Sequence, residues 1–191
     1  GNISDVQLGV PVAINIENGI AAMALAQLSG VSNEEIKTGM ASFRGVDRRF
    51  DFKIKTDKVV YLSDYAHHPE EIKQSILSMR ALYGDKKLTG IFQPHLYTRT
   101  RDFYQEFADS LSLLDEVILT DIYPARELPI EGVSSQLIYD NLRPDIDKIL
   151  CKKEEVIDIL KEKEIEVLMT LGAGDIENYA PQICEILDER C

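Results

Sequence analysis

The chain has 191 residues, with 33 acidic and 21 basic side chains and a formal net charge of −12 at pH 7. This charge argues against a broad binding surface for nucleic acid or for an anionic membrane, because both need clustered Lys and Arg side chains. Hydrophobic residues make up 45% of the chain and charged residues 28%, which excludes disordered and fibrous classes and favours one soluble globular domain, or one domain and part of another.

The first part of the chain is predicted to be helical. The segment Asn15–Ser29 is rich in Ala, Leu and Met, and its polar residues interrupt the roughly 18 apolar residues that a membrane span needs. Ser32 and Glu35 form a capping-box pattern that predicts the start of a second helix. The chain begins at Gly1 without an initiator Met or a signal segment, so we expect a piece of a longer protein.

From Phe50 onward, apolar and polar residues alternate instead. Segments 50–54 and 59–63, on either side of a Thr56-Asp57 turn, predict an antiparallel hairpin. Strands and helices then alternate with short links; the predicted strands are 88–92, 116–120, 148–150 and 166–171, and the predicted helices are 69–83, 99–113, 134–141, 153–162 and 175–187. This alternation predicts an α/β fold with a mostly parallel open sheet and flanking helices.

The change of pattern between Phe43 and Asp47 predicts a domain boundary. We expect residues 44–191 to form a complete domain. Residues 1–43 are expected to be the end of a preceding domain whose core lies mostly outside this chain.

The three histidines of the chain lie where predicted strands give way to helices. Ligands of open parallel sheets bind at these carboxyl ends of the strands. Helix initiation explains the Pro-Glu-Glu sequence that follows His67 and His68. It does not explain Asp64, Tyr65 and the two histidines, so we predict a functional role for residues of this group. Adjacent residues rarely converge on one ion, so His67 and His68 alone do not predict a metal site.

The second such junction carries His95 with Thr98, Arg99, Thr100 and Arg101, a basic cluster in an acidic protein. Arg forms paired hydrogen bonds to carboxylates and phosphates, so the cluster predicts a local site for an anion or a carboxylate. The alternative is that Arg99 and Arg101 pair with surface acids nearby.

Other signals leave alternatives open. Arg48 and Arg49 at the predicted boundary fit a ligand cleft or a solvated hinge. Gly172 and Gly174 fit an anion cradle or a tight strand-to-helix turn. The chemistry of segment 123–127 stays open.

Several motifs are absent from the sequence. The chain has no GxxxxGK[ST] loop, so a main phosphate loop would lie elsewhere, and it has no Ser-centred elbow or plausible Cys nucleophile. Cys151, Cys184 and Cys191 are widely spaced, which predicts neither a disulfide framework nor a zinc site and fits a reducing cytoplasm.

Several segments, taken in order, resemble the Mur ligases. They are Asn-Ile-Glu-Asn at 15–18, Phe-Arg-Gly-Val-Asp-Arg-Arg-Phe at 43–50, Asp-Tyr-Ala-His-His-Pro at 64–69, Phe-Gln-Pro-His-Leu-Tyr-Thr-Arg-Thr-Arg at 92–101, Tyr-Pro-Ala-Arg-Glu-Leu-Pro-Ile at 123–130 and Gly-Ala-Gly-Asp-Ile at 172–176. The resemblance is greatest to the family members that add L-alanine to UDP-N-acetylmuramate. It implies that residues 44–191 are the Rossmann-like C-terminal domain and that residues 1–43 are the last helices of a central ATPase domain.

The resemblance implies an ATP-dependent reaction of bacterial peptidoglycan synthesis, in the cytoplasm. The carboxylate of UDP-N-acetylmuramate would attack the γ-phosphate of ATP to form an acyl phosphate, and the amino group of L-alanine would then displace phosphate. Mg²⁺ would neutralise the phosphates, with its ligands mainly in the central domain. UDP-N-acetylmuramate would be bound mostly outside this chain, which would be inactive alone.

The resemblance also implies residue roles. The nucleotide would be bound by four residues, Asn15 and Asn18 on the adenine side and Arg48 and Asp64 near the ribose and phosphates. Tyr65, His95 and Arg99 would contact the incoming amino acid, with Arg99 holding its carboxylate. His67 would lie near the reaction centre, and His67 and His95 are the catalytic candidates.

Two positions depart from the family pattern as we expect it. Leu96 stands where many relatives have Arg, so carboxylate binding would depend more on Arg99 and on Arg101. Arg126 stands where we expect Gly, and no role is transferred to it.

Alternatives to this function remain. The ligase that recycles murein tripeptide onto the same UDP-sugar shares the His-His-Pro segment, but residues 93–99 favour the enzyme that adds alanine. A non-catalytic α/β binding module is another alternative, and a GxxGK[ST] loop upstream in the gene would exclude it.

Overall fold

The structure is a computed structural model that describes residues 2–10 and 13–190, so Gly1 and Cys191 lie outside the described residues. The chain divides into two compact units, residues 1–47 and residues 48–191. Each unit is described by itself below. Among the described residues, no helix is long and apolar enough to cross a membrane.

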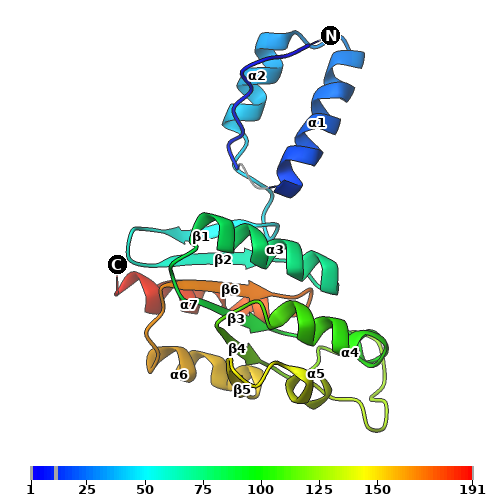
Figure 1. Ribbon diagram of the computed structural model, residues 1–191, viewed down its shortest axis with the longest axis vertical. Helices are drawn as coiled ribbons and strands as arrows, with labels where there is room; N and C mark the ends of the chain where they lie inside the picture. The colour runs from blue at the N-terminus through cyan, green and yellow to red at the C-terminus, as the bar shows by residue number, and fades with distance from the viewer. Residues whose placement is uncertain (1, 11–12, 191) are drawn as a thin grey trace. The chain divides into compact units, whose positions relative to one another are not determined.

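The first unit consists of α1 (Ala13–Leu28) and α2 (Asn33–Ser42) (Figure 1). The predicted capping box is confirmed: the backbone N–H of Glu35 donates to Ser32 Oγ at 3.4 Å, and the Ser32 N–H donates to the Glu35 carboxylate at 3.0 Å. Large apolar side chains on α1 stay exposed, namely Ile16, Ile20, Leu25 and Leu28. The unit therefore buries little of its own apolar surface.

The second unit is built on a sheet in the order β1-β2-β6-β3-β4-β5. Its strands are β1 (Asp51–Lys55), β2 (Val60–Asp64), β3 (Leu88–Phe92), β4 (Glu116–Leu119), β5 (Asp147–Leu150) and β6 (Val167–Leu171). β1 and β2 form the predicted antiparallel hairpin, with a register shift between Phe52 and Ile54, and all other strand pairs are parallel. The predicted α/β fold is confirmed.

Helices cover both faces of this sheet (Figure 1). They are α3 (Pro69–Leu82), α4 (Tyr97–Leu111), α5 (Gln136–Asn141), α6 (Val156–Lys161) and α7 (Ala180–Asp188). Ile91 of β3 packs with residues of α6 and α7, whereas the next residue, Phe92, packs against Phe107 of α4 with ring centroids 5.2 Å apart and the ring planes tilted by 38°. Because successive side chains of a strand point to opposite faces, α4 and its neighbours α3 and α5 cover the other face.

Besides α5, which begins at Gln136, two positions after its predicted start, three predicted helices start differently in the structure. The predicted helices 153–162 and 175–187 begin as short 3-10 turns, η1 (Lys153–Glu155) and η2 (Ile176–Tyr179). Pro181 lies in the first turn of α7, where its lack of an N–H is tolerated. The third helix, α4, begins at Tyr97, two positions before the predicted start.

The strand order determines where the site forms. β6, the last strand along the chain, lies between β2 and β3. Because these strands and β4 are parallel, their carboxyl ends meet at one edge of the sheet. The loops that begin at residues 65, 93, 120 and 172 all leave from that edge.

Candidate functional site

The loop after β2 is held by the acid in the first turn of α3. The backbone N–H groups of His67 and His68 donate to the Glu71 carboxylate at 3.0 and 3.2 Å. Nδ1 of His67 lies 2.9 Å from the carbonyl oxygen of Tyr65. Because a carbonyl only accepts, Nδ1 carries the proton, and Nε2 of the neutral His67 ring is left as an acceptor. His68 is exposed and packs its ring on Phe103, at 5.0 Å between centroids.

Asp64 ends β2 at the base of this loop. Its carboxylate accepts a hydrogen bond from the N–H of Ala66 at 3.4 Å. Burial raises the pKa of Asp64, and the hydrogen bonds that its carboxylate accepts only partly offset that effect. Asp64 is thus a partly desolvated acid at the carboxyl edge of the sheet.

The loop after β3 brings His95 and Arg99 together. Nη1 of Arg99 lies 3.3 Å from Nδ1 of His95. A guanidinium only donates, so Nδ1 of His95 is the acceptor and the neutral ring carries its proton on Nε2. Burial, and then the positive charge of Arg99, lower the pKa of His95, which favours the neutral ring. His67 and His95 therefore present opposite groups at Nε2, an acceptor and a donor.

A row of rings joins the two histidine loops. Tyr65 and His67 lie 5.1 Å apart, His67 and His95 6.2 Å, and His95 and Tyr123 5.7 Å, measured between ring centroids. β6 lies between β2 and β3 in the sheet, so the rings of the loops after β2 and β3 must span the width of β6 to come together. Tyr65, His67, His95 and Arg99, predicted separately from two junctions, thus lie in one cluster.

Arg48 joins this cluster through Tyr65. Its guanidinium carbon lies 4.8 Å from the centre of the Tyr65 ring, and that of Arg49 lies 5.8 Å away. Nε of Arg48 is buried without a hydrogen-bond partner among the described residues, and the Glu177 carboxylate is 3.9 Å from it. The Tyr65 N–H donates to the Arg48 carbonyl at 2.7 Å, so a backbone hydrogen bond also holds the loop after β2 to the segment before β1.

Close packing explains why the turn after β6 contains two glycines. Gly172 has φ +134°, and a Cβ there would lie 2.6 Å from the Gln93 carbonyl oxygen. A Cβ on Gly174 would lie 2.1 Å from Oε1 of Gln93. The buried Gln93 amide also donates to Asp175 at 2.8 Å and accepts from the Ile176 N–H at 2.9 Å. Of the two readings of Gly-Ala-Gly, the tight turn accounts for both glycines.

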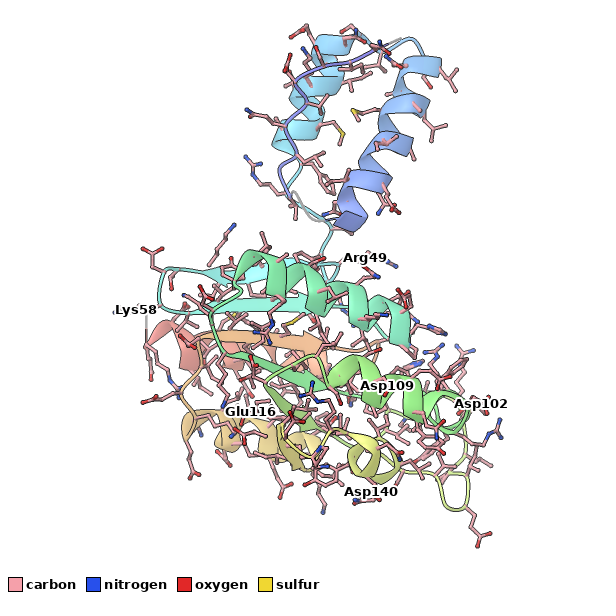
Figure 2. All side chains as sticks on the ribbon, in the orientation of Figure 1. Arg49, Lys58, Asp102, Asp109, Glu116 and Asp140 are labelled. Atoms are coloured by element: carbon pink, nitrogen blue, oxygen red, sulfur yellow. The ribbon has the colours of Figure 1, made fainter. Side chains whose placement is uncertain are left out.

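The remaining predicted residues fall outside the cluster. Arg101 is exposed and its Nε donates to Asp102 at 2.7 Å, so the surface-pair alternative describes Arg101 (Asp102 is labelled in Figure 2). Arg99, in contrast, has no carboxylate partner in the part of the chain that the structure describes. Asn15 and Asn18 lie on α1 of the first unit; the Asn15 amide donates to the Val10 carbonyl at 3.2 Å, and Asn18 is exposed.

The structure adds residues that sequence reasoning left out. Tyr123 stacks on His95, Gln93 braces the turn after β6, and Glu127 accepts hydrogen bonds from Thr98. Tyr123 and Gln93 each follow a predicted strand closely, which was the available signal. Glu127 contacts a residue 29 positions away, and no local pattern predicts that contact.

Residues 48–176 match the family model described as "Mur ligase, glutamate ligase domain". The chain belongs to the Mur ligase family. A UDP-N-acetylmuramate–L-alanine ligase of Phocaeicola vulgatus is 78% identical to it over 190 residues, which cover 100% of this chain and 42% of the relative. The chain thus spans about two fifths of the length of the curated Mur ligases that it matches.

Solved structures of Mur ligases share this fold. The UDP-N-acetylmuramate–alanine ligase of Thermotoga maritima matches with a TM-score of 0.81 and 27% identity, over 97% of this chain and 40% of that one. A murein peptide ligase of Psychrobacter arcticus matches with a TM-score of 0.67 over 95% of this chain and 38% of that one. At 19% identity, the second match supports the fold alone.

Proposed function

We propose that this chain is the C-terminal part of an ATP-dependent ligase that adds L-alanine to UDP-N-acetylmuramate in peptidoglycan precursor synthesis, in the bacterial cytoplasm. One observation carries the proposal. The Arg99 guanidinium, without a carboxylate partner among the described residues, lies against His95 at the carboxyl edge of the sheet, in a chain 78% identical to a ligase of that name. A free guanidinium at this edge suits the carboxylate of a small amino acid.

The proposed chemistry is amide formation from an acyl phosphate. The amino nitrogen of L-alanine attacks the acyl carbon, the bond from that carbon to the phosphate oxygen breaks, and phosphate leaves with the electron pair. The amine must also lose a proton. His67 can accept it at Nε2, because its Nδ1 proton is donated to the Tyr65 carbonyl. His95 presents Nε2–H instead, so we assign it to hydrogen bonding toward an oxygen of the substrate.

The nucleotide is assigned to Arg48 and Asp64 in the second unit. The buried Nε of Arg48, which makes no hydrogen bond to any described residue, is a donor suited to a phosphate or a ribose hydroxyl. Asn15 and Asn18 remain proposed for the adenine side. Among the described residues, no group of three or more His, Cys, Asp or Glu side chains could hold a metal ion. We therefore assign the expected Mg²⁺ ligands mainly to the rest of the longer protein and derive no step through the ion here.

We propose that residues 1–43 are the last helices of a central ATPase domain and that residues 44–191 are the C-terminal domain. The exposed apolar side chains of α1 support this, because a helix that is apolar around much of its surface normally packs against more protein. The family match, which begins at residue 48, also supports it.

An assay of the full-length enzyme tests the function. UDP-N-acetylmuramate and ATP would be supplied with L-alanine, glycine, L-serine or murein tripeptide, and phosphate release and amide product would be measured. We expect the highest kcat/KM with L-alanine. The 191-residue chain alone should give no turnover, since it has no phosphate loop. A higher kcat/KM with tripeptide, or no product with any acceptor, would contradict the proposal.

A further inference from the structure

The loop between β4 and α5 contacts the His95 loop through its backbone. The N–H of Tyr123 donates to the Pro94 carbonyl at 2.8 Å, and the N–H of Leu96 donates to the Tyr123 carbonyl at 3.0 Å. The two bonds flank His95 and form a parallel bridge between His95 and Tyr123. Within this bridge the two rings stack, with 21° between their planes. The Tyr123 ring therefore covers one face of the imidazole.

The same loop caps α4. The Glu127 carboxylate accepts hydrogen bonds from the backbone N–H of Thr98, at 2.9 Å, and from its hydroxyl, at 2.5 Å. These hydrogen bonds lower the pKa of Glu127, so the cap is a carboxylate at neutral pH. A negative charge is favourable at the N-terminus of a helix, where backbone N–H groups lack partners within the helix.

α4 needs this cap because its own sequence supplies none. The N-cap residue is Leu96, which has no polar side chain and makes no side-chain cap hydrogen bond. Leu96 also has φ +73° and ψ 135°, a backbone conformation that is strained for a residue with a Cβ. Two backbone hydrogen bonds hold this strained turn. The Leu96 N–H donates to the Tyr123 carbonyl, and the Leu96 carbonyl accepts from the Thr100 N–H at 3.1 Å.

We propose that Glu127 is a positioning residue for the acceptor site: through Thr98 it fixes the first turn of α4 and thereby holds Arg99 against His95. The proposal rests on the proposed function, because it assumes that Arg99 holds the acceptor carboxylate. Glu127 touches neither the acceptor nor the reacting atoms in this account. Its effect is on the position of the Arg99 guanidinium, because Arg99 follows Thr98 in the first turn of α4.

Kinetics of the full-length ligase test the proposal. Glu127→Ala should raise the KM for L-alanine by roughly tenfold or more, because a misplaced binding group loses most of its effect. Glu127→Gln should fall between wild type and Glu127→Ala, since the amide oxygen can still accept one of the two hydrogen bonds. The KM values for ATP and UDP-N-acetylmuramate should stay within about twofold of wild type.

Two control variants separate positioning from general stability. Glu131→Ala removes an exposed carboxylate from the same loop. Glu35→Ala removes the side chain that accepts the Ser32 N–H in the capping box of α2, in the first unit. Both should keep the wild-type KM for L-alanine, and Glu35→Ala should still lower the melting temperature.

A second measurement does not depend on the reaction. In the 191-residue chain, NMR signals of the His95 ring and the Arg99 side chain should shift more in Glu127→Ala than in Glu127→Gln, which also loses the negative charge near His95, whereas those of His68 should not shift. An L-alanine KM within about twofold of wild type in Glu127→Ala would overturn the proposal, as would an equal rise in all three KM values. If the wild-type enzyme does not use L-alanine, the proposed function fails, and the NMR shifts alone then support or overturn positioning by Glu127.

Discussion

Arg99 and Arg101 are two residues apart on α4 and have opposite surroundings. Arg101 is exposed and paired with Asp102, whereas Arg99 is half-buried beside His95. In the full-length ligase, Arg99→Ala should therefore weaken L-alanine binding by about 2 kcal/mol, a rise of roughly 30-fold in KM. Arg101→Ala is the matched control and should change this KM by less than about twofold. Equal effects of the two substitutions would contradict the role of Arg99.

His95 should make the free energy of unfolding depend on pH. Its pKa in the folded chain is lowered from the ordinary 6.5, by burial first and then by Arg99. The unfolded chain therefore binds this proton more readily, so the free energy of unfolding should fall as the pH drops below about 6.5, until the pH passes below the folded pKa.

Urea unfolding of the 191-residue chain at about pH 7.5 and about pH 5 would measure this effect. The loss of stability between the two pH values should be smaller in His95→Gln than in wild type. His68→Gln, which changes an exposed histidine, should lose as much as wild type. A loss in His95→Gln equal to that of wild type would remove His95 as the cause.

At the scale of elements, the turn after β6 and the loop between β4 and α5 each supply one glycine of a matched pair. Gly172 and Gly132 both have positive φ, but a Cβ on Gly172 would meet the Gln93 carbonyl, whereas nothing lies within 4 Å of one on Gly132. Gly132→Ala should therefore lower the free energy of unfolding by about 1 kcal/mol, from backbone strain alone. Gly172→Ala should lower it by at least about 2 kcal/mol more, because strand and turn must separate. Equal losses in urea unfolding would show that this close approach carries no cost.

Most elements could be predicted from the sequence because their signals are local. The Ser32–Glu35 cap, the hairpin and β3 at 88–92 follow from short-range patterns, and the structure confirms them. The start of α4 could not be predicted in this way. Leu96 has no polar side chain to cap the helix, and the capping carboxylate comes instead from Glu127, 29 residues after Thr98.

The same contrast holds for the candidate site. Strand ends followed by His, Asp and Arg indicated Asp64, His67, His95 and Arg99 without any knowledge of their distances. Their pairing could not be predicted, since it depends on the strand order. Tyr123 was not predicted either, because its stacking on His95 follows from β4 lying next to β3. The roles of all these residues stay predictions until the variants are measured.

At the scale of the whole molecule, the sequence suggested a break between residues 43 and 47, and the chain divides into compact units after residue 47. At that point the sequence changes from an Ala-rich helical pattern to alternating apolar and polar residues, and this change predicts the break. The family match covers residues 48–176, and the chain spans about two fifths of the length of its curated relatives. The sequence could not indicate that β6, the last strand along the chain, lies in the middle of the sheet.

That strand order has a consequence for synthesis on the ribosome. β2 and β3 are translated before β6, yet neither pairs with the other, and β6 must be inserted between them before the His67 and His95 loops can meet. A nascent chain that has not yet released residues 167–171 from the exit tunnel can form hairpins and helices but not the ring row. The ring row can therefore form only after β6, the last strand along the described chain, has been synthesised.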